Sequence, residues 1–133
     1  MNVRCLVPIL NVTNIVESFA WFEKLGWKKL WDWGAPPTFG AVGTGSIEIF
    51  LCERGQGHAG SRLDAAASGE EIGVWMAWNL GSPAEVVAAH AAALREGLVV
   101  TWPPTNEPWG MREFHLRHPD GHTFRVGASL DED

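Results

Sequence analysis

The sequence predicts an α+β fold in which a βαβββ order of elements occurs twice. Two helical segments carry the same end signals, with a capping residue at the start (Asn14 and Ser82) and a glycine after the end (Gly26 and Gly97). A β-prone segment precedes each helix, and three more follow it, separated by proline and glycine. Identity between the halves is low, so the prediction depends on element order and turn chemistry. An unrelated α+β sandwich with accidental symmetry is the alternative.

The first half is predicted to cover residues 1–53. It opens with a β-rich strand over residues 3–12. Asn14 is expected to cap the following helix, with Glu17 completing a capping-box-like signal, and Gly26 to end it. Three short strands are expected at residues 27–33, 38–42 and 46–52, with turns at residues 36–37 and 43–45.

The second half, residues 72–128, follows a linker over residues 54–71 that is rich in Gly, Ala and Ser. A strand is expected over residues 73–80, and then a helix over residues 83–95 that has proline at its first position. Further strands are expected at 98–102, 110–117 and 122–126, separated by prolines 103–104 and the turn 119–121, with an acidic tail at 129–133. The whole chain, residues 1–133, is expected to be a single domain.

Composition excludes several classes of function. The net charge of −6 and only ten scattered Lys and Arg residues argue against a nucleic-acid partner and favour weak attraction of a cationic ligand. No stretch approaches the roughly 20 apolar residues that span a membrane. Cys5 and Cys52 are far apart in the sequence and are expected to be reduced thiols. We therefore expect a soluble, cytoplasmic protein without a membrane partner.

Four segments carry a resemblance to a known family. They are VPILNVTN at 7–14, SFAWF at 18–22, LGW at 25–27 and PWGMREFHLRHPDGH at 108–122. Together they resemble the vicinal oxygen chelate superfamily of glyoxalases, bleomycin-resistance proteins and extradiol dioxygenases, and the last segment resembles the bleomycin-resistance group in particular. The resemblance spans nearly the whole chain. It implies that the two βαβββ modules form a curled mixed sheet around a cleft, often completed in a homodimer.

The resemblance also assigns four positions to metal ligands in the family's metal enzymes. In this sequence they are occupied by Val7, Glu48, Trp75 and Arg125. Only Glu48 has a donor atom suited to a cation, so we expect neither a metal nor another cofactor. A different metal site at Glu113 and His115, which alternate on one strand face, is a second possibility beside solvated or capping histidines.

The predicted ligand-binding wall is apolar and aromatic, with a few polar groups. Residues of alternating strand positions and Trp residues near turns would face the ligand. Glu48 and Arg125 could form an ion pair there, or each could reach solvent separately. The predicted ligand-binding residues are Val7, Ile9, Asn11, Trp33, Glu48, Phe50, Trp75, Trp102, Trp109 and Arg125.

The function that these features favour is metal-independent binding and sequestration of a small planar, cationic natural product, as in bleomycin-type antibiotic resistance. The chain has no Ser/His/Asp or Cys/His grouping and no phosphate-binding glycine loop, so no catalytic residue is predicted. Two alternatives remain. One is a lyase or isomerase that uses Glu48 or a histidine as its base, and the other is a metabolite carrier.

Overall fold

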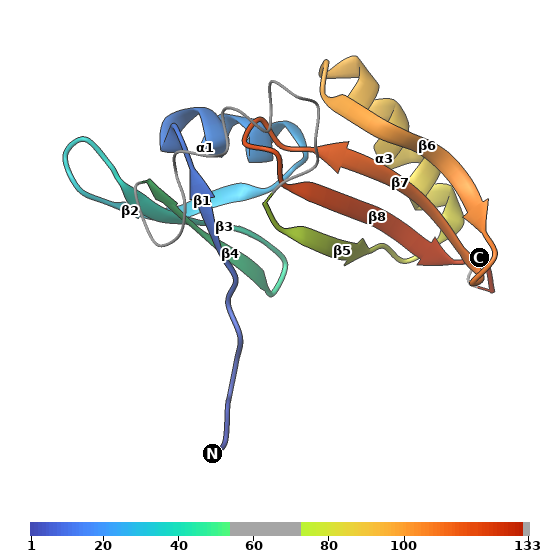
Figure 1. The fold of residues 1–133 in the computed structure, drawn as a ribbon, viewed down its shortest axis with the longest axis horizontal. Coiled ribbons are helices and arrows are strands. Elements are labelled where there is room, and N and C mark those ends of the chain that lie inside the picture. Colours follow the sequence, from blue (N-terminus) through green and yellow to red (C-terminus); the bar gives the residue numbers. More distant parts are fainter. Residues whose placement is uncertain (54–72, 132–133) are drawn as a thin grey trace. The chain divides into compact units, whose positions relative to one another are not determined.

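The computed structural model describes residues 1–53 and 73–131, which belong to two compact units, Met1–Ser61 and Arg62–Asp133. We call them the first and the second unit. Among the described residues, each has one helix and a four-stranded mixed sheet, with strand orders β1-β4-β3-β2 and β5-β8-β7-β6 (Figure 1). The predicted repeat of βαβββ modules is therefore confirmed. The predicted linker 54–71 lies outside the described residues.

The first unit follows the capping signals of its sequence. The Asn14 side chain accepts the backbone N–H of Glu17 at 3.0 Å, which satisfies one donor at the start of the helix. Gly26 follows the helix with φ +87°, a conformation that glycine adopts without steric cost. The elements are β1 (Ile9–Val12), α1 (Ile15–Lys24), β2 (Lys28–Trp33), β3 (Phe39–Thr44) and β4 (Ile47–Glu53).

One face of the first sheet packs against α1 and forms a core. Alternate residues of β1 and β4, among them Leu10 and Leu51, are fully buried on this face, together with Phe22 of the helix. Gly40 of β3 lies directly under the Phe19 ring. A Cβ atom at Gly40 would come within 2.6 Å of that ring and 2.8 Å of the Trp31 carbonyl oxygen, so the close packing requires glycine there.

The first strand is shorter than the sequence predicts. It was expected from residue 3, but β1 begins at Ile9, and Val7 precedes it. The β-prone residues before Pro8 have no neighbouring strand among the described residues, and Pro8 has no N–H to give a ladder. Pro8 takes part only as an acceptor, from the backbone N–H of Phe50 at 2.9 Å. High β-propensity therefore does not make a strand where no partner strand is present.

The second unit repeats this arrangement with stronger helix ends. Ser82 Oγ accepts the N–H of Glu85 at 3.2 Å, and the Glu85 carboxylate accepts the N–H of Gly81 at 2.6 Å. Gly97 follows the helix with φ +72°. The elements are β5 (Trp75–Asn79), α3 (Pro83–Arg95), β6 (Val99–Glu107), β7 (Met111–Arg117) and β8 (Thr123–Ser129).

Two boundaries in the second unit differ from the prediction. Pro103 and Pro104 were expected to end a strand, yet β6 continues through them to Glu107. Its register shifts between Val100 and Trp102 and again between Trp102 and Thr105, so the prolines lie at bulges, where no ladder bond from their nitrogen is needed. β8 continues to Ser129, which pairs with Met111, so the predicted tail begins inside a strand.

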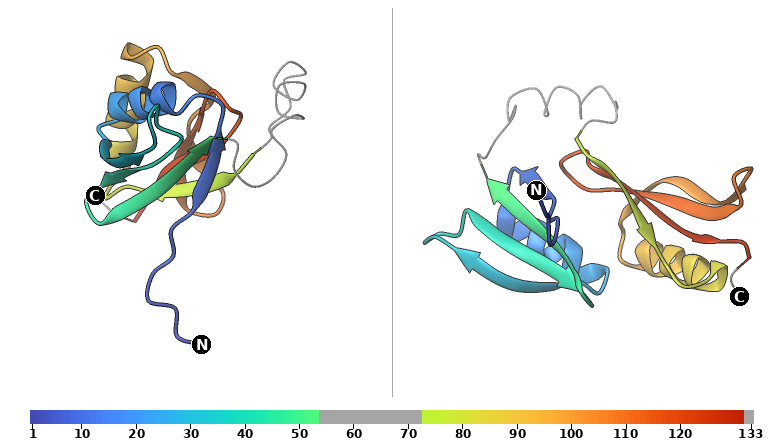
Figure 2. Two further views of the ribbon diagram at one scale, coloured as in Figure 1. Left: turned by 90° about the vertical axis from the view of Figure 1, so that its left-hand side faces the viewer. Right: turned by 90° about the horizontal axis from the view of Figure 1, so that it is seen from below.

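The helix α3 covers one face of its sheet, and no described helix of the same unit covers the other face, as with α1 in the first unit (Figure 2). Under α3, Phe114 and Phe124 are fully buried, and the ring of Trp78 stacks on Phe124 with a centroid distance of 4.2 Å. The face opposite α3 carries the polar and aromatic side chains described below. No helix in the described part of the chain is long and apolar enough to cross a membrane.

Candidate functional site

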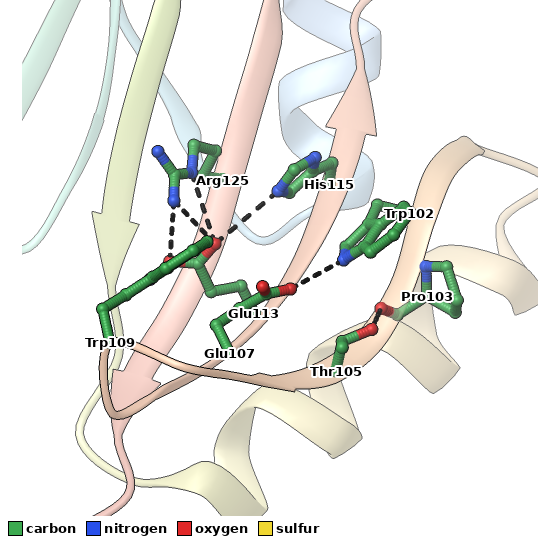
Figure 3. A network of polar contacts seen from close by, with 8 residues as sticks. All are labelled: Trp102, Pro103, Thr105, Glu107, Trp109, Glu113, His115 and Arg125. Atoms are coloured by element: carbon green, nitrogen blue, oxygen red, sulfur yellow. Dashed lines mark hydrogen bonds and ion pairs between the residues drawn. The ribbon is translucent and has the colours of Figure 1, made fainter.

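The face of the second sheet opposite α3 contains a cavity of about 310 Å³. Its side chains come from β6, β7 and β8 and from the turn between β6 and β7 (Figure 3). Strand alternation explains the selection, because register partners such as His115 and Arg125 point to the same face. The lining residues are Trp102, Glu107, Trp109, Glu113, His115 and Arg125.

An ion pair between neighbouring strands lies at the centre of the cavity. Arg125 Nη2 lies 2.9 Å and 3.1 Å from the two carboxylate oxygens of Glu113, and Arg125 Nε donates to Oε1 at 3.3 Å. Glu113 is only 5% exposed, so few waters can reach the carboxylate, and the protein itself must supply its donors. Gly127 is the register partner of Glu113 on β8, and the absence of a side chain there leaves room for the carboxylate.

The pKa of Glu113 is lowered by this environment. Burial acts to raise the pKa of the carboxyl, but the hydrogen bonds from Arg125 and Trp109, the positive charge of Arg125 and the contact with His115 together outweigh it. Glu113 is therefore ionised at neutral pH, and the cavity contains a fixed pair of opposite charges.

Trp109 is oriented by the same carboxylate. Its indole N–H donates to Glu113 Oε2 at 3.1 Å, while the Arg125 guanidinium carbon lies 5.6 Å from the centre of its ring. The next residue, Gly110, has φ +86° and donates its N–H to the carbonyl of Glu107, which closes the turn between β6 and β7. The indole is 58% exposed although it is fixed, so its surface is available to a ligand.

A second indole is held by a second carboxylate. The indole N–H of Trp102 donates to Glu107 Oε1 at 2.9 Å, and the ring is 45% exposed. The His115 ring follows at a centroid distance of 6.2 Å, and the Trp75 ring lies 5.6 Å beyond His115 in an edge-to-face contact. The second sheet thus presents a row of aromatic rings, Trp102, His115 and Trp75, on one face.

The structure brings together three of the predicted ligand-binding residues, Trp102, Trp109 and Arg125, on one cavity, with Trp75 beside it. Glu113 and His115 were expected to share a strand face, and they do, with His115 Nε2 3.7 Å from Glu113 Oε1. Glu107 was not predicted. The register shift between Trp102 and Thr105 brings it to the face of Trp102, and the signal for this shift in the sequence is the pair Pro103 and Pro104, which was interpreted as a strand end.

The predicted residues of the first unit lie on or near the face opposite α1. Ile9 is 52% exposed while its neighbour Leu10 is fully buried, and Asn11, Glu48 and Phe50 share the alternation of Ile9. Trp33, at the end of β2, is 70% exposed, and Val7 is half-buried ahead of β1. The prediction missed an aromatic cluster on this sheet, in which the rings of Trp31, Phe39 and Phe50 lie 5.3–5.6 Å apart.

The predicted ion pair between Glu48 and Arg125 stays a prediction. It would join the two units, each of which the structure describes by itself. Within the second unit the acceptor of Arg125 is Glu113.

Comparison with known proteins assigns the chain to a family. Residues 4–126 match the family model described as "Glyoxalase/Bleomycin resistance protein/Dioxygenase superfamily". The chain belongs to this superfamily. No curated protein matches the sequence.

Solved structures of this superfamily's fold match almost the whole chain. TioX from Micromonospora sp. ML1 is 18% identical, with a TM-score of 0.74 over 94% of this chain and 98% of TioX. A bleomycin-binding protein complexed with bleomycin is 18% identical, with a TM-score of 0.69 over 96% of this chain and 99% of that protein. A bleomycin resistance determinant encoded on the transposon Tn5 is 18% identical, with a TM-score of 0.70 over 96% and 98% of the two chains.

The four positions to which the family resemblance assigns metal ligands do not fit a metal ion. Trp75 offers no lone pair for a cation, and Arg125 is a permanent cation, two of whose nitrogens donate to Glu113. Val7 is apolar, and Glu48 alone has a suitable oxygen. Over residues 1–53 and 73–131, no group of three or more His, Cys, Asp or Glu residues is arranged to hold a metal ion.

Proposed function

We propose that this protein binds and sequesters a small planar, cationic natural product without a metal ion, in the manner of bleomycin-type antibiotic resistance. The observation that carries the proposal is the pair of exposed indoles at the cavity, Trp102 and Trp109, each fixed by a hydrogen bond to its own carboxylate. Rings that are already oriented lose little side-chain entropy when a flat ligand stacks on them.

The charges of the cavity favour a cation. Glu107 and Glu113 contribute two carboxylates, and Arg125 neutralises only Glu113. The chain as a whole has a net charge of −6, which attracts cations over a longer range. Exposed indole faces add a favourable cation–π contact for a ligand that places a positive group over the ring face.

The relatives support the same class of ligand. One protein of this fold is complexed with bleomycin, and another is a bleomycin resistance determinant, each 18% identical to this chain. Fold alone does not fix function, so the cavity is the main support for ligand binding, and the relatives indicate the class of ligand.

The proposal extends to the other predicted residues. Trp75 continues the row of rings beside the cavity. The first unit carries further proposed ligand contacts on or near its face opposite α1, among them the exposed residues Ile9 and Trp33, and we propose that the chain forms a homodimer. The remaining proposed contacts on that unit are Val7, Asn11, Glu48 and Phe50.

A fluorescence titration tests the proposal. Metal-free bleomycin and unrelated planar cationic antibiotics are added to the protein in EDTA, and indole quenching is recorded. We expect saturable quenching at about one ligand per chain, and its loss in Trp102→Ala and Trp109→Ala. The matched control is Trp78→Phe, which removes a half-buried indole that stacks on Phe124 on the α3 side of the sheet. Quenching that persists unchanged in both alanine variants would contradict this site.

A second candidate function is a lyase or isomerase activity, favoured by the position of His115. Its ring lines the cavity, and Nε2 lies 3.7 Å from Glu113, an arrangement in which a carboxylate can orient an imidazole base. Product formation from a bound ligand in EDTA, abolished in His115→Phe, would favour this activity. Tight binding without product would favour sequestration.

A further inference from the structure

The guanidinium of Arg125 has an unused end. Its Nε and Nη2 both donate to Glu113, whereas Nη1 has no acceptor among the described residues. Figure 3 shows this third nitrogen on the side of the guanidinium away from Glu113. The side chain is 35% exposed, so the two N–H groups of Nη1 are within reach of a molecule in the cavity that Arg125 lines.

These donors are fixed in position before any ligand arrives. A carboxylate that is itself 5% exposed holds the guanidinium by two nitrogens, and the Trp109 ring lies beside it. Most of the rotamer freedom of an arginine side chain is therefore already lost. Glu113 also offsets the charge of Arg125, so recognition at Nη1 depends on directed hydrogen bonds more than on net charge.

At Glu107 the cavity offers a hydrogen-bond acceptor, whereas at Arg125 it offers donors. One oxygen of that carboxylate accepts the indole N–H of Trp102, and the other has no donor among the described residues. A positive or hydrogen-donating group would satisfy it. Donors at Arg125 and an acceptor at Glu107 therefore line the same cavity as the rings of Trp102, Trp109 and His115.

We infer that the ligand of this site is a flat molecule with polar groups of two kinds, an acceptor oxygen that binds Arg125 Nη1 and an amino or similar donor group that binds Glu107. The inference rests on the proposed function and narrows it, because a flat cation without an oxygen acceptor uses only half of the site. A carboxylate and a carbonyl share the required chemistry.

Three flat probes of equal ring size test the inference on the full chain. The first is aminomethyl-naphthalene, the second has a carboxylate added on the far ring, and the third has a primary carboxamide at the same place. Dissociation constants are measured by calorimetry in EDTA. We expect the oxygen-bearing probes to bind at least about tenfold more tightly than the first, since each adds a hydrogen bond to the charged guanidinium. The carboxylate and carboxamide arms distinguish an anion from a neutral carbonyl.

The variant Arg125→Lys provides the second measurement. Lysine keeps a cation beside Glu113 but lacks the separate Nη1 donors, so the ratio of dissociation constants between the oxygen-bearing and oxygen-free probes should fall to about one. The matched control is Arg112→Lys, because Arg112 lies on β7 outside the cavity lining and bonds Asn106. Its ratio should equal that of the unmodified protein.

The outcomes separate the inference from the proposed function. Equal binding of all three probes, or a ratio that survives Arg125→Lys, overturns the inference and leaves sequestration of a flat cation standing. If none of the probes and none of the planar antibiotics binds, both are overturned.

Discussion

Arg125 on β8 holds both carboxylate oxygens of Glu113 on β7, from a position two residues along the ladder from the direct register partner of Glu113. That partner is Gly127, which leaves the space above the carboxylate open. The diagonal pair thus joins the two central strands of the second sheet through their side chains as well as their backbones.

Removing the charge of Glu113 should destabilise the second unit. In Glu113→Gln the guanidinium loses its counter-ion while the amide stays buried, so we expect the free energy of unfolding to fall by about 1–3 kcal/mol. Urea denaturation measures the change. The control is Glu23→Gln on the exposed side of α1, which should stay within about 0.5 kcal/mol of the parent. An equal stability of the two variants would show that the pair contributes nothing.

The same pair should give the protein an acid-sensitive stability. Because the pKa of Glu113 is lower in the folded than in the unfolded chain, its contribution is complete above the unfolded pKa, near 4.5, and is lost as the pH falls from there through the folded pKa. The difference in unfolding free energy between the parent and Glu113→Gln should therefore be constant near neutral pH and shrink below about pH 4.5. Denaturation at a series of pH values measures it. If this difference in unfolding free energy instead grows on acidification, the pKa of Glu113 is raised, not lowered, in the folded chain.

Gly40 should tolerate no side chain. In Gly40→Ala the new methyl group would meet the Phe19 ring and the Trp31 carbonyl oxygen, and the backbone atom cannot move without disturbing the pairing of β2 with β3. We expect a loss of about 1–3 kcal/mol in thermal or urea unfolding. Combining it with Phe19→Leu should recover part of the Gly40→Ala effect, because it removes one of the two contacts. Strict additivity of the two changes would refute this account.

His122 should control the start of β5. Its Nδ1 accepts the backbone N–H of Val74 at 3.0 Å, which ties the turn before β8 to the residue preceding Trp75. In His122→Phe this acceptor is lost, so hydrogen exchange at the Val74 amide should accelerate at least about tenfold. His122→Asn offers an oxygen in a similar place and should retain more protection. Unchanged exchange in the phenylalanine variant would mean that β5 is held by its ladder alone.

The parts of the fold that depend on short-range chemistry could be predicted from the sequence. The caps at Asn14 and Ser82 and the glycines that end both helices lie where the prediction placed them, because capping depends on residues within one turn. The strand over residues 3–12 was predicted too long, because propensity cannot reveal where a partner strand ends.

The cavity residues could also be predicted only in part, because some of them depend on how the strands pair. Trp102, Trp109 and Arg125 could be proposed from turn proximity and from the family resemblance. Glu107 was missed, since the register shift that brings it to the face of Trp102 depends on pairing with β7, and the prolines at that shift were interpreted as a strand end. The aromatic cluster of Trp31, Phe39 and Phe50 was missed for a similar reason, because it requires knowing the pairing of β2, β3 and β4.

The bulged course of β6 has an evolutionary consequence. Strict alternation fixes the direction of most strand side chains, but a register shift between Trp102 and Thr105 separates Trp102 from Glu107. An insertion or deletion at residues 103–104 would therefore rotate one cavity wall relative to the other while Val99 and Met111 keep their partners. Related proteins with a different length at residues 103–104 can therefore differ in the width of the pocket. The buried core under α3 need not change at the same time.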